Sequence, residues 1–174
     1  LNEPVGVIGM ICPADYPLLG FVSLVAPAVV RGNTCVVCPS EEHPLAATDL
    51  YQVLDTSDLP GGVINIIPGI PNQVAKTMVE HQHVDSMWYF RGSAEGVAGS
   101  YHIERLSSGN MKRTFVDYGE CRAQRSCFAE LRSLGLHQIG LDRAWTDPQQ
   151  GEGDEFLQES TEVKHVWVPI GESL

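Results

Sequence analysis

The sequence predicts an α/β fold in which helices cover both faces of a parallel β-sheet. Short apolar runs, such as residues 5–11 and 63–67, are continuous rather than alternating, which is typical of strands buried on both faces. Helical segments alternate with these runs, and turns containing glycine or proline separate them. The 174 residues are enough for one domain with a substantial core.

Residues 3–41 predict one complete βαβ unit. An apolar strand leads through a proline-containing turn to a helix at 18–30, and a second strand follows at 34–37. The helix is apolar nearly all round, so we expect it to be buried, and Pro27 is predicted to kink or shorten it. The turns of this unit lie where a Rossmann-like fold would bind a nucleotide.

The alternation of helices and strands continues as far as residue 119. Asn72 is predicted to cap one of the helices. The further helices are expected at residues 44–54, 72–80 and 94–106, and the further strands at residues 63–67, 87–90 and 114–116.

The pattern changes in the last third of the chain. Residues 120–160 are polar and acidic and predict an irregular linker, with one helical stretch at 128–136. The terminal segment, 161–174, contains a predicted strand from Val163 to Val168 with one exposed face. A lone strand must pair with the edge of its own sheet or with another subunit, so we expect an oligomerisation-type strand.

Composition excludes several classes of protein. The net charge of −11 disfavours binding to nucleic acid, whose phosphates are also negative. The longest apolar stretch is too short and too interrupted to cross a membrane. Five cysteines without a secretion signal indicate reduced thiols in the cytoplasm. The first residue is not methionine, so we interpret the chain as a fragment of a longer polypeptide.

Several motifs occur in the order found in one large family. Residues 90–95, Phe-Arg-Gly-Ser-Ala-Glu, resemble the Phe-Thr-Gly-Ser-Thr-Glu turn of the aldehyde dehydrogenase superfamily. Residues 110–113, Asn-Met-Lys-Arg, resemble its Asn-Leu-Lys-Arg segment, and residues 60–65, Pro-Gly-Gly-Val-Ile-Asn, resemble one of its strand entries. The resemblance implies an NAD-binding-like domain over residues 1–119 and a family of oxidoreductases that oxidise aldehydes with NAD(P).

The end of the chain resembles the same superfamily. Residues 161–164, Thr-Glu-Val-Lys, are similar to its C-terminal oligomerisation strand, whereas the catalytic domain expected between them and residue 119 is missing. This combination is most similar to the truncated second domain of the aldehyde dehydrogenase family 16 proteins. The resemblance therefore implies association, as a homo-oligomer or with a partner domain, through the segment from Val163 to Val168.

The resemblance assigns the catalytic groups to positions where this chain differs. The family's Gly-Gln-x-Cys nucleophile turn is absent, and Cys127 is more plausible as an ordinary thiol. The oxyanion-binding amide corresponds to Asp15, a carboxylate that would repel developing negative charge. The water-activating Glu corresponds to Asp117, which is one methylene shorter.

The cofactor positions are partly retained. Glu41 matches the carboxylate that binds the ribose, and Gly92 with Ser93 match the turn that contacts the pyrophosphate. Pro71 and Ala75 replace glycines that the family keeps near the adenine. The resemblance therefore implies that NAD or NADP binds weakly or not at all.

Two further motifs have ordinary explanations. Cys35 and Cys38 form a CxxC pair, but residues three apart on a strand point to opposite faces, so we expect no redox pair. His81 and His83 have no accompanying ligands, so no metal site is predicted. The leading hypothesis is a non-catalytic pseudoenzyme domain. The alternative is part of an active NAD-dependent enzyme whose nucleophile lies elsewhere in the parent chain.

Overall fold

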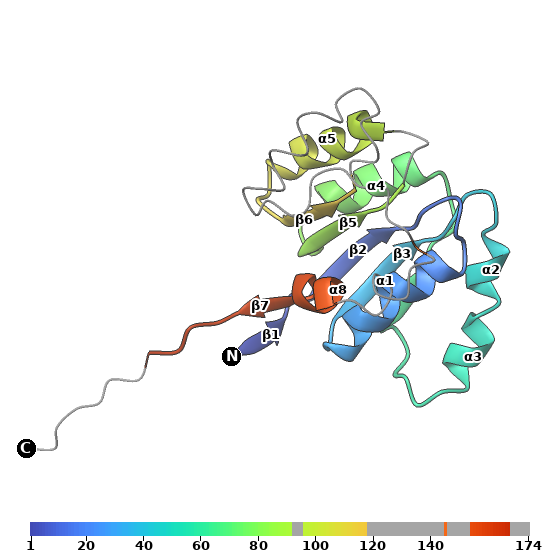
Figure 1. Ribbon diagram of the computed structural model, residues 1–174, viewed down its shortest axis with the longest axis horizontal. Coiled ribbons are helices and arrows are strands. Elements are labelled where there is room, and N and C mark those ends of the chain that lie inside the picture. Colours follow the sequence, from blue (N-terminus) through green and yellow to red (C-terminus); the bar gives the residue numbers. More distant parts are fainter. Residues whose placement is uncertain (92–95, 118–144, 146–153, 168–174) are drawn as a thin grey trace, which may run out of the picture.

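A parallel five-stranded sheet forms the centre of the computed structural model, which describes residues 1–91, 96–117, 145 and 154–167 (Figure 1). The strand order is β4-β3-β2-β5-β6, and every neighbouring pair is parallel. The predicted α/β fold class is therefore confirmed. The strands are β2 (Val7–Ile11), β3 (Thr34–Cys38), β4 (Ile64–Ile66), β5 (Ser86–Tyr89) and β6 (Arg113–Val116).

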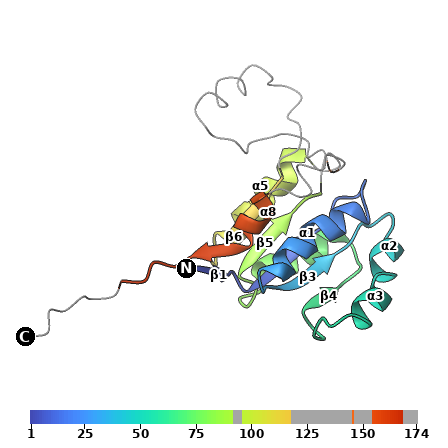
Figure 2. The same cartoon turned by 60° about the horizontal axis from the view of Figure 1, so that its bottom comes forward.

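Helices cover both faces of this sheet. Helices α1 (Leu19–Val30) and α8 (Asp154–Glu159) lie over one face, and α4 (Pro71–Glu80) and α5 (Gly96–Ser107) lie over the other (Figures 1 and 2). The core is accordingly divided into two clusters. The α1 side is rich in aromatic rings, and the α4 side is built mainly from aliphatic and methionine side chains.

The aromatic cluster joins the chain's last helix to the sheet. Trp88 and Phe115 lie on β5 and β6, and Phe90 directly follows β5. The rings of Trp145 and Phe156 pack against these three at centroid separations of 5.8–6.1 Å. Edge-to-face ring pairs at such distances stabilise a core beyond the area they bury. Helix α8 lies within the stretch 120–160, which the sequence predicted to be irregular. The prediction missed this helix because its two apolar residues, Phe156 and Leu157, are adjacent and give no helical period.

Three local predictions about helices were wrong. The segment 44–54 forms two short helices, α2 (Leu45–Thr48) and α3 (Tyr51–Asp55), rather than one. Asn72 does not cap α4; Ile70 holds the cap position and Pro71, whose missing N–H costs nothing there, begins the helix. Of the two effects predicted for Pro27, a kink or a shorter helix, the shortening is wrong, because α1 continues to Val30.

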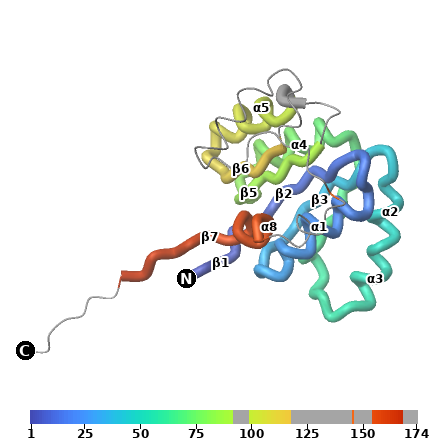
Figure 3. The backbone as a smooth tube through the Cα atoms, in the orientation of Figure 1, coloured from blue at the N-terminus to red at the C-terminus, as the bar shows by residue number. Residues whose placement is uncertain are grey.

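The C-terminal strand is shorter than predicted and pairs within the chain. Strand β7 (Thr161–Val163) runs antiparallel to β1 (Asn2–Pro4), whereas residues 164–167 form no strand and Val168 lies outside the described residues. Residues 164–167 lead away from the fold (Figures 1 and 3). Their side chains are exposed to solvent, with Trp167 91% exposed.

Residues 110–113, Asn-Met-Lys-Arg, connect neighbouring elements through hydrogen bonds and an ion pair. The Lys112 ammonium donates to the carbonyls of Met78, His81 and Val84, at 3.1, 2.7 and 2.9 Å, and so satisfies acceptors at the C-terminal end of α4. Arg113 pairs with Glu159 at 2.8 Å and ties α8 to β6. These residues therefore have structural partners that explain why the segment has this composition.

Among the described residues, no helix has both the length and the apolar character needed to cross a lipid bilayer.

Candidate functional site

The order of the strands defines one switch point at the carboxyl ends of the strands. The space outside the carboxyl ends of β2, β3 and β5 is called the carboxyl-end crevice. Numbered along the chain, the five strands lie in the order 3-2-1-4-5, so the order reverses at the first strand, β2, which has β3 on one side and β5 on the other. In open α/β sheets, ligands bind outside the carboxyl ends of the strands at such a switch point. The residues that follow β2, β3 and β5 are therefore the candidates for function.

An ion pair crosses this crevice. Arg91, which follows β5, places Nη2 at 3.2 Å from Oε2 of Glu41, which follows β3. Because β2 lies between β3 and β5, the pair spans the carboxyl end of the central strand. The Arg91 side chain is 16% exposed and that of Glu41 47% exposed. Glu41 was predicted as a site residue from the family resemblance, whereas its partner was not.

The turn that carries Asp15 is fixed by hydrogen bonds from the neighbouring strand. The buried Ser40 hydroxyl donates to the Ala14 carbonyl at 2.9 Å, and the Cys12 N–H donates to the Cys38 carbonyl at 3.0 Å. Asp15 itself lies in a bend directly after β2 and is exposed to solvent. Position 15 is thus at the crevice.

Asp117 lies at the carboxyl end of β6, the outer strand on one side of the sheet. It follows β6, its N–H donates to the Tyr89 carbonyl at 2.9 Å, and its carbonyl accepts a hydrogen bond from Ser100. Strand β5 separates the ends of β2 and β6, so Asp15 and Asp117 follow strands that are not adjacent. Gly92, Ser93 and Cys127, the other predicted positions, lie outside the described residues.

A small polar hollow opens between α4 and α5, on the face of the sheet that these two helices cover. It measures about 210 Å³, and its lining includes Asn72, Lys76, Tyr89 and His102. The Tyr89 hydroxyl donates to Asn72 Oδ1 at 3.5 Å. Ala75, one of the positions where, by the resemblance, this chain replaces a glycine near the adenine, is fully buried in the α4-side cluster.

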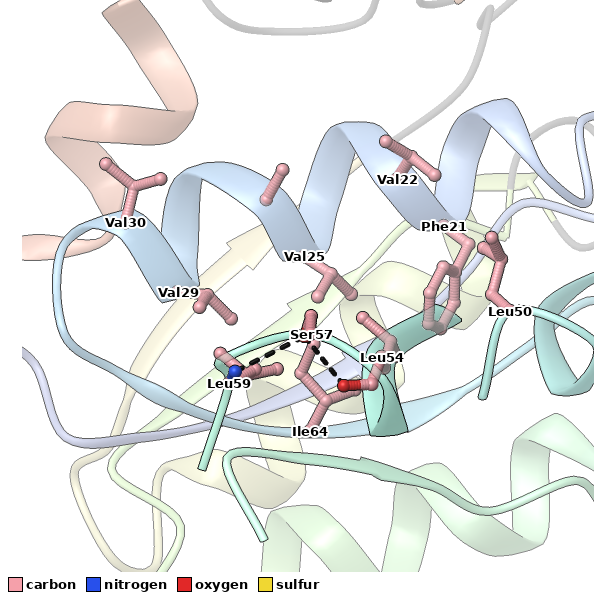
Figure 4. A pocket seen from close by; sticks show the side chains of 11 residues that line it. Phe21, Val22, Val25, Val29, Val30, Leu50, Leu54, Ser57, Leu59 and Ile64 are labelled. Atoms are coloured by element: carbon pink, nitrogen blue, oxygen red, sulfur yellow. Dashed lines mark hydrogen bonds between the residues drawn. The ribbon is translucent and has the colours of Figure 1, made fainter. Parts of the chain in front are cut away.

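An apolar hollow of about 340 Å³ lies on the opposite face, between α1 and α3 (Figure 4). Among its described lining residues the polar side chain is Ser57, whose hydroxyl donates to the Leu54 carbonyl and accepts from the Leu59 N–H. With that hydroxyl already engaged, the hollow presents no polar group to orient a reacting substrate. The candidate site is therefore the carboxyl-end crevice.

The thiols of the described residues are buried. Cys35 lies in the α1-side cluster and Cys38 in the α4-side cluster, which confirms that the CxxC pair points to opposite faces. Burial raises the pKa of Cys35 to about 12 and that of Cys38 to about 11, and it raises the pKa of Cys12 further. All three thiols are protonated at neutral pH and are poor nucleophiles.

Other potential ligand groups are scattered. His81 and His83 have ring centroids 5.7 Å apart, and the His83 N–H donates to His81 Nδ1. Within the described part of the chain, no three His, Cys, Asp or Glu side chains form a group that would hold a metal ion.

Comparison with known proteins places these features in context. A model described as "Aldehyde dehydrogenase family" matches residues 1–120. Aldehyde dehydrogenase 1A1 of Equus caballus is 37% identical over 118 residues, which are 68% of this chain and 23% of that protein. Retinal dehydrogenase 2 of Gallus gallus is 36% identical over 118 residues, covering 68% of this chain and 22% of its own length.

Solved structures agree with the sequence comparison. A putative aldehyde dehydrogenase from Burkholderia cenocepacia superposes with a TM-score of 0.63 and 32% identity, covering 69% of this chain and 24% of that chain. An indole-3-acetaldehyde dehydrogenase of P. syringae, in complex with NAD+ and IAA, gives a TM-score of 0.64 and 31% identity over 69% of this chain and 24% of its own. The chain therefore spans about a quarter of the length of these proteins.

Proposed function

The chain belongs to the aldehyde dehydrogenase family, and from that premise we propose that it is a non-catalytic domain of the family that serves structure or association. The observation that carries the proposal is Asp15, an acidic side chain at the end of the central strand. Aldehyde oxidation through a covalent thiol adduct develops negative charge on the carbonyl oxygen. A carboxylate at that position opposes the charge, whereas an amide N–H stabilises it.

The described thiols support the same proposal. A thiolate is the nucleophile in this chemistry, and Cys12, Cys35 and Cys38 are buried and protonated. None of these three sulfur atoms is suited to attack an aldehyde in the crevice. Cys127, in its polar stretch without a nucleophile motif, is proposed to be an ordinary thiol.

An assay of aldehyde oxidation tests the proposal. We expect the 174-residue chain to form no NADH from NAD+ and a short aliphatic or aromatic aldehyde, and we expect the same of Asp15→Asn, because restoring one amide supplies no nucleophile. Aldehyde-dependent NADH formation that Cys127→Ser abolishes would overturn the proposal. The matched control is Cys121→Ser, which removes the neighbouring thiol in the same stretch.

A second proposal remains open because the crevice and Glu41 are retained, and because one structural neighbour is an NAD+ complex. Here the chain is part of an active NAD-dependent enzyme whose nucleophile lies elsewhere in the parent polypeptide. Tight NAD+ binding by the isolated chain in a calorimetric titration supports this alternative. Weak or absent binding supports the non-catalytic domain.

Association through the C-terminal segment is the third part of the proposal. Strand β7 is paired on one side with β1, and Val163, Val166 and Trp167 are 66%, 59% and 91% exposed. An exposed strand edge followed by exposed apolar side chains favours pairing with a second copy or a partner domain. We also propose that the chain is most similar to the truncated second domain of the aldehyde dehydrogenase family 16 proteins. The exposed C-terminal segment fits that proposal.

Size-exclusion chromatography with light scattering tests the association. The intact chain is expected to be oligomeric, and deletion of residues 164–174, which leaves β7 in place, is expected to yield a monomer because it removes the exposed apolar side chains. The substitution Trp167→Ser, at full chain length, serves as the matched variant. An unchanged number of subunits in both variants would count against association through this segment.

The compartment is also a proposal. Cys12, Cys35 and Cys38 are free thiols, which favours a reducing compartment such as the cytoplasm.

A further inference from the structure

We propose that the Arg91–Glu41 ion pair is an internal competitor for nucleotide, so that NAD+ gains full access to the crevice only when Arg91 releases Glu41. This inference rests on the proposed function, since it explains how a domain of this family keeps the crevice but binds cofactor weakly. It also identifies the residue responsible. Its evidence is the geometry of the pair.

The first step concerns the carboxylate. In a doubly wound sheet, an acidic side chain following the second strand accepts hydrogen bonds from the ribose hydroxyls of a dinucleotide. Glu41 has this position, three residues after β3, the second strand of the sheet along the chain. Its Oε2 already accepts from Arg91 Nη2 at 3.2 Å. Ribose hydroxyls must therefore compete with a charged donor, which forms a stronger hydrogen bond than a neutral one.

The second step concerns space. The pair joins the ends of β3 and β5, so the Arg91 side chain lies across the carboxyl end of β2. A dinucleotide binds across the same switch point. Ligand and side chain therefore need the same volume, independently of the hydrogen bonds to Glu41.

The third step concerns the arginine. A guanidinium stays charged at every accessible pH and has no acceptor atoms, so it needs an anionic or carbonyl partner when it is largely buried. Glu41 supplies such an anionic partner to Arg91, whose side chain is 16% exposed. In the family's Phe-Thr-Gly-Ser-Thr-Glu turn this position is threonine, a shorter and neutral side chain. Arg91→Thr is therefore the direct test.

Calorimetric titration with NAD+ measures the competition. We expect Arg91→Thr to bind NAD+ at least about tenfold more tightly than the original chain, which corresponds to about 1.4 kcal/mol. The matched control is Arg31→Thr, which removes the same charge at an exposed position. Arg31 follows α1 and precedes β3, so it lies near the amino ends of the strands, away from the crevice. Its affinity for NAD+ should be unchanged.

A second pair of variants separates the two steps. If the gain comes from freeing the carboxylate, it should shrink when Arg91→Thr is made together with Glu41→Ala. If the gain comes from space alone, it should persist there, and either result supports competition by Arg91. Circular dichroism and thermal unfolding confirm that each variant is folded before titration.

Two outcomes overturn the inference. Weaker NAD+ binding by Arg91→Thr would mean that Arg91 holds the phosphates of the ligand rather than excluding it. Equal or undetectable binding in both proteins would mean that the pair is not what limits binding. Neither outcome bears on aldehyde oxidation, so failure here and failure of the non-catalytic proposal are recognised by different measurements.

Discussion

Replacement of Asn33 by aspartate is expected to destabilise the fold by about 3–5 kcal/mol, because it leaves a buried charge with one N–H donor and no positive partner. Asn33 is 1% exposed. Its Nδ2 donates to the carbonyls of Ala28 and Ser160, at 2.9 and 2.8 Å, and its Oδ1 accepts from the Gly6 N–H at 2.9 Å. A carboxylate keeps the contact to Gly6 but sets an oxygen against two carbonyl oxygens.

The matched control is Asn65→Asp. Asn65 also donates through Nδ2 to two carbonyls, those of Cys35 and Gly62, but its side chain is exposed. Water replaces the lost donor there, so we expect a cost of about 1 kcal/mol. Urea unfolding followed by tryptophan fluorescence measures both, because Trp88 is fully buried. Equal costs for the two variants would contradict the buried network around Asn33.

Acidification provides a second check on this prediction. Protonation of the new carboxyl group restores one donor, so the difference in stability between Asn33→Asp and the original chain should shrink as the pH falls through the range in which that group titrates. The Asn65→Asp difference should change less. A difference that is independent of pH would indicate that the loss comes from altered packing rather than from the unpaired charge.

The Asn33 side chain explains why the C-terminal segment belongs to the fold. Its contact with Ser160 joins the end of α1 to a residue 127 positions away. The Arg113 ion pair to Glu159 and its hydrogen bond to the Thr161 carbonyl hold the same segment from β6. Contacts from Asn33 and from Arg113 therefore fix the direction in which β7 leaves α8.

The sequence predicted the sheet well because its strands are buried on both faces. A continuous apolar run such as Val7–Ile11 is visible without knowledge of the fold. Helix α8 was missed because it has one buried aromatic residue, Phe156, amid acidic neighbours, and its stability depends on packing against α1 and the sheet. The single helix predicted for 44–54 failed because the continuous helical spacing conceals a break between α2 and α3.

The site was predicted in part for a related reason. Glu41 was found because it matches the family's ribose-binding carboxylate in a motif that is read locally along the chain. Its partner was not, because Arg91 lies 50 residues away and the two meet only through the strand order β3-β2-β5. Periodicity and motif spacing contain no information on that order. The one signal available was the arginine that stands where the family's turn has threonine.

Alkaline pH is expected to destabilise the protein through its buried thiols. An exposed thiol has a pKa of 9.0, and burial raises the pKa of Cys35 to about 12. The unfolded chain therefore loses this proton at a lower pH than the folded chain. The stabilisation is complete below pH 9 and is lost as the pH rises toward 12, and one pKa unit corresponds to about 1.4 kcal/mol.

Cys35→Val isolates this contribution. Valine is apolar, favours strands and does not titrate, so the variant should have nearly the stability of the original chain at pH 7, within about 1.5 kcal/mol. Between pH 9 and 11 the original chain should lose about 2 kcal/mol more than the variant, as measured by urea unfolding in the presence of a reductant. Thr34→Val, the neighbouring residue on β3, is the control and should keep the original pH dependence.

Comparison between the two proteins removes the other titrating groups. Desolvation lowers the pKa of Lys112, with Asp85 opposing the shift, so that lysine makes the fold more stable as the pH approaches 10.5. This opposite contribution is present in both proteins and cancels in their difference. Parallel pH profiles for Cys35→Val and the original chain would mean that Cys35 is accessible to water. That result would contradict the position of Cys35 in the α1-side cluster of the core, where its side chain is fully buried.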